Sequence, residues 1–286
     1  MEPKSLRLPV THGLSLHALE WSQEGTLLLF LHGFGNDAHV WDWCAPSFAP
    51  HYRVVALDHR GHGRSDRDPE ARYDHESMAQ DVAAAMDALG AARAVIVGHS
   101  LGGRVAMRFA GLYPERVAGL VIVDSAPELD ARGTTRIRLD VQQQDPSFAS
   151  LRDYERVLQR QYPVTKPEML NALAGHWAQQ RPDGRFELRL DPAFMRGRKG
   201  ASEAELARWS ELEAKHLWSA LEKLPCPALV VRGAASDVLS ADVADKMADD
   251  VLENGRLEVI ARAGHSVMLD NPEAFEKALA SFVLGE

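Results

Sequence analysis

The sequence predicts an α/β protein with a mostly parallel, doubly wound sheet and an inserted helical cap domain. Short, unbroken apolar runs recur along the chain, which is typical of strands buried on both faces of a parallel sheet. Helical patterns lie between these runs, and such alternation favours parallel strands joined by helices. The predicted strands, in chain order, are Leu27–Leu31, Val54–Leu57, Ala94–Val97, Leu120–Val123, Ala228–Val231 and Leu257–Ile260.

The other elements follow from local periodicity and from residues that start or stop helices. Alternating apolar residues in Leu14–Ala18 predict an antiparallel edge strand. Apolar residues three and four apart predict a helix over Glu76–Leu89, which Gly90 ends. A second helix is expected over Leu101–Leu112, directly after a strand, and the pair Asn271–Pro272 starts a last one.

The alternation stops between the fourth and the fifth predicted strand. Pro127–Glu222 contains helical patterns and aromatic residues but no convincing parallel strand. We therefore expect a core domain formed by residues 1–126 and 223–286, and a helical cap, or lid, formed by residues 127–222. The insertion leaves the sheet after Val123, at the carboxyl edge, where ligands bind in open α/β sheets. The insertion is thus expected to cover a site there and to contribute little to the stability of the core domain.

Composition excludes several functional classes. The chain has 286 residues, of which 26% are charged, and its formal net charge of −9 disfavours binding to nucleic acid or to anionic membrane surfaces. Because no apolar stretch resembles a signal peptide or is long enough to span a membrane, we expect a cytoplasmic protein. Cys44 and Cys226 have no metal-binding or redox spacing and are expected to be buried thiols.

The strongest local motif is Gly98–Gly102, with the sequence G-H-S-L-G. It lies between a predicted strand and a predicted helix, which is the context that a nucleophile elbow requires. Such a turn holds its central serine in a strained backbone conformation, so the positions two before and two after must be very small. Ser100 is therefore the predicted nucleophile.

A serine hydroxyl becomes nucleophilic when a base removes its proton and a carboxylate orients that base. His265 follows the last predicted strand in a tight turn, at the edge of the sheet where catalytic groups gather. Asp237 follows the preceding strand at the equivalent position, and the order Ser100, Asp237, His265 matches the order in which these three residue types follow a nucleophile elbow. Asp124, at the end of the strand after the nucleophile strand, is the alternative acid.

The tetrahedral intermediate of acyl transfer also requires donors aimed at its oxyanion. The predicted donors are the backbone N–H groups of Phe34, in a loop after a strand, and of Leu101, at a helix N-terminus. Phe34, Trp41, His99 and Trp177 are predicted to line a largely apolar substrate pocket with few charged groups.

Two other chemistries are weaker interpretations of the same segments. The spacing in Gly33–Ala38, with Asp58 at the end of the next strand, resembles a dinucleotide fingerprint and makes an NAD-dependent oxidoreductase a rival. That fingerprint requires a helix, and the segment after Ala38 has a poor helical pattern. His59 and His62 lack the dense spacing of a metal site. We therefore expect no cofactor and no metal, and we expect Asp58 and Arg60 to fix their loop.

Together these motifs resemble the α/β-hydrolase superfamily over nearly the whole chain. The loop His32–Gly35, the segment Asp58–Ser65, the elbow Gly98–Gly103, Asp237 and the pair Gly264–His265 follow that family's order and spacing. The resemblance implies a Ser–His–Asp hydrolase without a cofactor, in which the insertion is the variable helical lid.

Within the superfamily the chain is similar to small bacterial esterases, enol-lactone hydrolases, carbon–carbon bond hydrolases and cofactor-free haloperoxidase-like enzymes. Epoxide hydrolases and haloalkane dehalogenases carry an aspartate where this chain has Ser100, so those activities are disfavoured. The expected function is hydrolysis of a small apolar carboxylic ester or lactone through an acyl-enzyme on Ser100. The alternatives are carbon–carbon cleavage of vinylogous diketones, a haloperoxidase- or perhydrolase-like activity, and a binding protein, against which the intact catalytic set argues.

Overall fold

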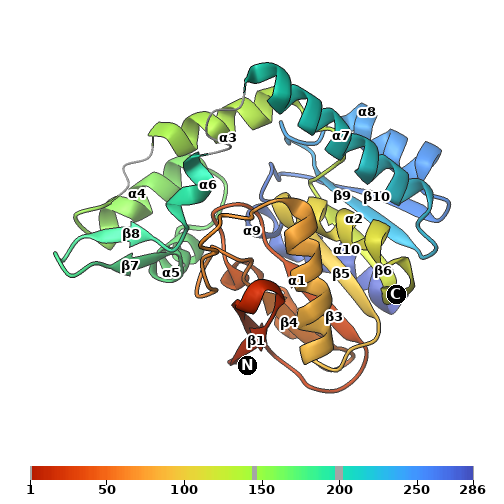
Figure 1. Ribbon diagram of the computed structural model, residues 1–286, viewed down its shortest axis with the longest axis horizontal. Coiled ribbons are helices and arrows are strands. Elements are labelled where there is room, and N and C mark those ends of the chain that lie inside the picture. The colour runs from red at the N-terminus through yellow and green to blue at the C-terminus, as the bar shows by residue number, and fades with distance from the viewer. Residues whose placement is uncertain (1, 144–146, 197–201, 286) are drawn as a thin grey trace.

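The computed structural model describes residues 2–143, 147–196 and 202–285. Its main sheet has eight strands in the order β1-β2-β4-β3-β5-β6-β9-β10 (Figure 1). Strand β2 pairs antiparallel with β1 and β4, and the remaining pairs are parallel. The predicted α/β fold with a mostly parallel sheet is confirmed. The strands are β1 Lys4–Pro9, β2 Ser15–Glu20, β3 Leu27–Leu31, β4 Arg53–Leu57, β5 Ala94–His99, β6 Val117–Val123, β9 Ala228–Gly233 and β10 Gly255–Ile260.

Helices cover both faces of this sheet (Figure 1). Those joining or following its strands are α1 His75–Ala88, α2 Leu101–Leu112, α8 Ala241–Asp245, α9 Val267–Asp270 and α10 Pro272–Leu284. Asp74 caps α1 and Asn271 caps α10, and Gly90 takes the positive φ of 68° that ends the first of them. Across the described ranges, no helix is both long and apolar enough to cross a lipid bilayer.

The central strands are apolar throughout because each buries side chains on both faces of the sheet. In β3, Leu27, Leu29 and Leu31 join an apolar cluster with α1 and α2, whereas Leu28 and Phe30 join a second cluster with α10 on the opposite face. This two-sided burial explains why unbroken runs predicted five of the six parallel strands, whereas Leu257–Ile260 is interrupted by Glu258 and lies in the partly buried β10. Both cysteines are free and buried, as expected.

The two edges of the sheet differ from the prediction. The alternating segment Leu14–Ala18 overlaps β2, but β1 pairs with the outer side of β2, so β2 is not an edge strand. The outer strand was missed because most of its residues are at least partly exposed and show no apolar run. At the other edge β10 is only partly buried, and Val259 is half exposed.

Between β6 and β9 the insertion forms helices and one short antiparallel hairpin, β7–β8, which the sequence did not predict. Its C-terminal helix packs on α2 and places Leu217 and Leu221 in the cluster around α1. Tyr154, Leu158 and Leu173 join the cluster on the opposite face. The insertion thus shares both apolar clusters with the sheet, and this packing speaks against the expectation that it adds little to stability. Its elements are α3 Ala131–Gln143, α4 Leu151–Gln161, α5 Pro167–Trp177, β7 Ala178–Gln180, β8 Phe186–Leu188, α6 Pro192–Arg196 and α7 Glu203–Glu222.

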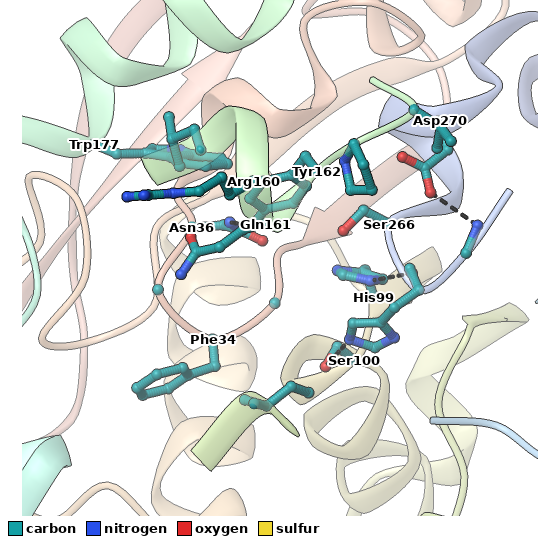
Figure 2. Close-up of a pocket in the computed structure, with 18 of the residues that line it drawn as sticks. Phe34, Asn36, His99, Ser100, Arg160, Gln161, Tyr162, Trp177, Ser266 and Asp270 are labelled. Carbon is teal, nitrogen blue, oxygen red and sulfur yellow. Dashed lines mark hydrogen bonds between the residues drawn. The ribbon is translucent and has the colours of Figure 1, made fainter. Parts of the chain in front are cut away.

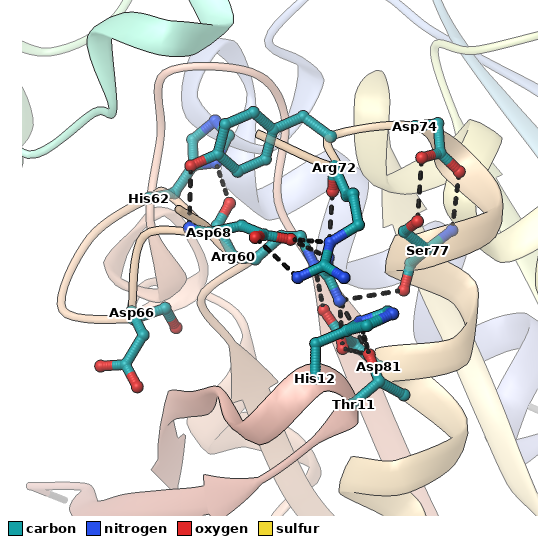
Figure 3. A network of polar contacts seen from close by, with 12 residues as sticks. Thr11, His12, Arg60, His62, Asp66, Asp68, Arg72, Asp74, Ser77 and Asp81 are labelled. Carbon is teal, nitrogen blue, oxygen red and sulfur yellow. Dashed lines mark hydrogen bonds and ion pairs between the residues drawn. The ribbon is translucent and has the colours of Figure 1, made fainter. Parts of the chain in front are cut away.

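A buried ion network fixes the loop after β4 (Figure 3). Arg60 is fully buried and donates from Nε and Nη2 to the two carboxylate oxygens of Asp81, at 2.6 and 2.7 Å. It also donates to Asp68 at 2.9 Å and to the Thr11 hydroxyl at 2.8 Å. This bidentate geometry holds the loop to α1 and confirms the structural role expected of Arg60.

Asp58 has a similar structural role next to this network. Its carboxylate pairs with His17 Nδ1 at 2.8 Å and accepts the backbone N–H groups of Ala38 and Arg64 at 2.7 and 2.9 Å. The segment that follows Gly33 forms two short 3-10 turns, η2 Ala38–Trp41 and η3 Ala45–Phe48. The helix that a dinucleotide fingerprint needs is not formed in this segment, which removes the structural basis of that rival.

Candidate active site

The nucleophile elbow forms at the turn from β5 to α2. Ser100 has φ 52° and ψ −113°, a strained conformation for a residue with a side chain. A Cβ atom at Gly98 would collide with the backbone of Gly102, and one at Gly102 would collide with the carbonyl group of Leu31. Both positions therefore require glycine, and the sharp turn presents Ser100 at the carboxyl edge of the sheet.

His265 lies against this serine, in the loop between β10 and α9. Its Nε2 atom is 3.0 Å from Ser100 Oγ, and its Nδ1 atom is 2.7 Å from the carboxylate of Asp124. These two contacts are those of a base that can take the serine proton while a carboxylate fixes its tautomer. The structure thus brings Ser100 and His265 together as predicted.

The acid of this arrangement is Asp124 and not Asp237, so the preference for Asp237 was wrong. Asp124 is fully buried directly after β6 and has a positive φ of 46°. Besides His265, its carboxylate accepts the N–H of Gly233 at 3.1 Å and the hydroxyl of Ser236 at 2.6 Å. Ser236 is a positioning residue that the sequence analysis missed, although it stands one residue before Asp237.

Asp237, in the loop after β9, pairs with the insertion instead of the histidine. It forms a bidentate pair with Arg136 of α3, with distances of 2.6 and 2.9 Å. The hydrogen bonds from this guanidinium lower the pKa of Asp237. The loop thus presents Ser236 to Asp124 and leaves Asp237 to join the insertion to the sheet.

The predicted oxyanion donors lie on two segments that are bonded together. The N–H of Gly102 donates to the carbonyl of His32 at 3.1 Å, which holds the loop containing Phe34 against the start of α2. Within the described ranges, the N–H groups of Phe34 and Leu101 donate to no protein acceptor. Two unused backbone donors beside a serine nucleophile are what an oxyanion hole requires.

His99, predicted as a pocket residue, lies in the cavity wall behind the catalytic loop (Figure 2). Its Nε2–H donates to the carbonyl of His265 at 2.9 Å. Burial, together with the nearby His265, lowers the pKa of His99 well below its usual range. A neutral His99 therefore supports the main chain of the catalytic histidine, and Gly33 leaves the room for its ring.

A cavity of about 1460 Å³ opens above Ser100, between the sheet edge and the insertion. Phe34 and Trp177 line it, as predicted (Figure 2). Trp41 does not, so this prediction was wrong: its ring is fully buried in the core, 5.0 Å from the Phe30 ring and 6.1 Å from that of Phe275.

The cavity wall is more charged than the sequence indicated. Asp270 was not singled out in the sequence, yet its carboxylate accepts the N–H of Gly264, next to His265, and the hydroxyl of Thr165 from the insertion, both at 2.8 Å. It therefore links the catalytic loop to the insertion. The expectation of few charged groups was wrong, because the charged lining residues are Arg67, Arg136, Arg160, Lys166, Glu187, Asp237, Arg262, Asp270 and Glu273.

Three neutral histidines lie behind the oxyanion loop and join it to the Arg60 loop. His32 accepts the N–H of His59 at 3.0 Å, and the rings of His32 and His62 lie 5.2 Å apart. His62 Nδ1–H donates to the carbonyl of Arg60 at 3.2 Å. Burial lowers the pKa of His59 to about 3 and that of His62 to about 4. These histidines serve as neutral packing groups at neutral pH.

The fold and this geometry define a protein of the hydrolase class, with a serine, a histidine and an aspartate in contact at the carboxyl edge of an α/β sheet. The family model described as alpha/beta hydrolase fold matches residues 26–272, so the chain belongs to this family. The resemblance found in the sequence is confirmed.

The relatives do not share one reaction. The chain is 28% identical to 2-(acetamidomethylene)succinate hydrolase of Mesorhizobium japonicum, over 91% of this chain and 88% of that protein. It is 30% identical to a non-heme chloroperoxidase of Streptomyces lividans, over 95% and 96% of the two chains. The crystal structure of E-2-(acetamidomethylene)succinate hydrolase superposes with a TM-score of 0.85 at 26% identity, covering 98% of this chain and 99% of that one. Family membership therefore gives the class, and the substrate must be argued from the site.

Proposed function

We propose that this protein hydrolyses carboxylic esters or lactones through an acyl-enzyme on Ser100. The observation that carries the proposal is the continuous chain of contacts from Ser100 Oγ through His265 to Asp124, at 3.0 and 2.7 Å. A serine in an elbow conformation with both partners in hydrogen-bond range is the arrangement that activates a hydroxyl for acyl transfer.

In the proposed reaction, Ser100 Oγ attacks the ester carbonyl while His265 Nε2 takes the hydroxyl proton. The N–H groups of Phe34 and Leu101 stabilise the oxyanion, and His265 returns the proton to the leaving alcohol oxygen. A water molecule, deprotonated by the same nitrogen, then cleaves the acyl-enzyme. Asp124 stabilises the imidazolium formed in each half of the cycle.

The test is labelling with a fluorophosphonate probe, together with turnover of p-nitrophenyl esters. We expect Ser100→Ala to lose the label and to lower kcat by about 10⁶-fold, the effect of removing the nucleophile in another serine hydrolase. Ser266→Ala removes a different hydroxyl from the cavity wall and should keep both label and activity. Labelling that survives in Ser100→Ala would disprove the mechanism. Vinylogous diketone cleavage with no ester turnover would instead support the carbon–carbon alternative.

The charged wall leads us to propose that the preferred ester carries a carboxylate. Arg160, at the end of α4, lines the cavity (Figure 2) and has no acidic partner in the part of the chain that the structure describes. Asp237 and Asp270, by contrast, are already engaged by Arg136 and by Thr165 with Gly264. An unpaired guanidinium in a substrate cavity favours an anionic group on the substrate. One relative's name, a succinate derivative hydrolase, agrees with this chemistry.

This preference can be tested with two esters of matched length, p-nitrophenyl valerate and mono-p-nitrophenyl glutarate. Because Arg160 is exposed, we expect Arg160→Gln to lower kcat/KM for the charged ester by about fivefold and to leave the neutral ester within about twofold. Arg156→Gln is the matched control, since Arg156 lies on the same helix, pairs with Asp153 and is not in the cavity wall. Equal effects of the two variants would contradict the proposal.

A further inference from the structure

A second group of side chains with metal-ligand chemistry lies where the insertion meets the sheet domain. His39 and Asp42 come from the turn η2 and its end, and His176 comes from α5. His39 Nδ1 is 2.9 Å from Asp42 Oδ2, and the rings of His39 and His176 stack with centroids 3.5 Å apart. One ligand atom from each of the three side chains lies within 4.8 Å of the other two. The mechanism proposed above uses none of them.

Part of the hydrogen-bonding capacity of this group is unused. Asp42 Oδ1 is buried and has no hydrogen-bond partner among the residues that the structure describes, although its second oxygen contacts His39. In the described ranges His176 makes no hydrogen bond through either ring nitrogen. A buried carboxylate oxygen without a donor is unfavourable, and a bound cation would satisfy it.

The surrounding charges allow a cation to bind. Burial lowers the pKa of His176 to about 4, so the ring is neutral and offers a lone pair. Burial also acts to lower the pKa of His39, but the hydrogen bond that His39 donates to Asp42 and the charge of Asp37 outweigh it and raise that pKa. Arg64 and Arg189 oppose a cation near His176, whereas the carboxylates of Asp37, Asp42 and Asp58 favour one near His39.

We propose that His39, Asp42 and His176 form a binding site for Zn²⁺ or a similar divalent transition-metal ion. Two imidazoles and a carboxylate are ligands that suit Zn²⁺, and three protein ligands leave a position for water. Bonds of about 2.1 Å to a tetrahedral ion place ligand atoms about 3.4 Å apart. Binding therefore requires the group to contract, and it requires one ring to turn out of the stack, because a metal lies in the plane of each imidazole that it binds.

A bound ion would join α5 to η2, and its position next to Trp177 has a consequence. Trp177 follows His176, lines the cavity, and donates from Nε1 to Asp37 at 3.0 Å. A metal at the neighbouring residue would restrain this wall of the cavity. Because an ion that binds only the folded state raises its stability, Zn²⁺ should raise the melting temperature. This inference does not depend on the proposed ester hydrolysis.

The experiment is calorimetric titration of the metal-free protein with Zn²⁺ at neutral pH, with melting temperature as a second readout. We expect one ion per chain, and at least about tenfold weaker binding in His176→Gln and in Asp42→Asn, both of which preserve side-chain size. His51→Ala, which removes an exposed histidine elsewhere, should bind Zn²⁺ like the unaltered protein.

A fourth variant separates this group from the catalytic one. His265→Asn should retain Zn²⁺ binding, because the proposed ligands do not include the catalytic histidine. The proposal is overturned if the unaltered protein binds no stoichiometric Zn²⁺, if His176→Gln and Asp42→Asn bind it normally, or if only His265→Asn loses it. Should one of the two ligand variants fail to fold in chelator, the other decides the outcome.

Discussion

The Arg60 network and the Ser100–His265–Asp124 chain are both built from buried polar groups, and they differ in where they end. Arg60 donates only to groups of the protein itself, among them Asp68, Asp81 and Thr11, so no donor remains for a ligand (Figure 3). The catalytic chain ends at a serine hydroxyl in the wall of a cavity (Figure 2). A buried network that closes on itself stabilises the fold, whereas one that opens to a cavity can do chemistry.

The largest expected effect comes from replacing Asp124, the acid of the Ser100–His265–Asp124 chain. In Asp124→Asn the amide would face His265 Nδ1 and favour the wrong tautomer, so kcat should fall by about 10⁴-fold, the effect of the analogous change in a serine protease. Asp237→Asn should change kcat by less than about threefold, because Asp237 pairs with Arg136 at the cavity rim. Steady-state kinetics and circular dichroism of both variants provide the check. Equal losses would return Asp237 to the catalytic machinery.

The choice between these two acids shows where sequence reasoning ends. Both follow strands that meet at one edge of the sheet, so the pattern made both candidates. What separates them is the course of the chain at the end of β9 and in the loop after it, which places Gly233 and Ser236 against Asp124. Asp237 in turn contacts Arg136, which is distant in sequence. Neither feature has a local signal in the sequence.

The strands and the nucleophile elbow were predictable because the evidence for them lies in short stretches of sequence. The apolar run Leu27–Leu31 identifies its strand directly, because burial on both faces of the sheet requires an apolar residue at each position. The elbow is also readable from a short stretch of sequence, since the two glycines that flank Ser100 stand in one motif, although the contact that requires glycine at position 102 is with Leu31 of β3. The residues that line the cavity depend on tertiary packing and could not be predicted in this way. Trp41 is buried in the core, and Arg160 lines the cavity because the insertion packs over the sheet edge.

Breaking the Arg60 network should lower the stability of the protein and leave kcat unchanged, whereas Asp124→Asn should lower kcat. Arg60→Met would leave the buried carboxylate of Asp81 without its cationic partner, which typically costs about 3–5 kcal/mol of unfolding free energy, whereas Asp68 would keep its pair with Arg72. The kcat of the molecules that remain folded should be unchanged. Arg7→Met is the control, because Arg7 pairs with Asp66 at the surface and its loss should cost less than about 1 kcal/mol. Denaturant unfolding with activity assays decides, and a lost kcat at full stability would contradict this comparison.

A smaller effect, on the pH dependence of stability, is expected at His62, which lies between the Arg60 loop and the oxyanion loop. Burial lowers its pKa from 6.5 to about 4, so between these values the unfolded chain binds a proton there and the folded chain does not. Each pH unit of acidification in this range therefore removes about 1.4 kcal/mol of stability through this residue. His62→Gln should remove that contribution, so its unfolding free energy should fall less steeply with acid. Parallel pH profiles of the two proteins would show that His62 titrates normally.

The place of the insertion in the chain has a consequence for synthesis on the ribosome. β9 can pair with β6 only after residues 127–222 have emerged, and His265 follows the last strand of the sheet. The closure cost of so long a loop grows slowly, by about 0.6 kcal/mol per doubling of length, so the intervening segment can vary in length at little thermodynamic cost. The delay has a larger kinetic cost. Until β9 has been synthesised, one edge of β6 stays unpaired, and strands of other unfinished chains can pair with it. A growing chain thus has its nucleophile long before its base, and activity would report only on the final stage of folding.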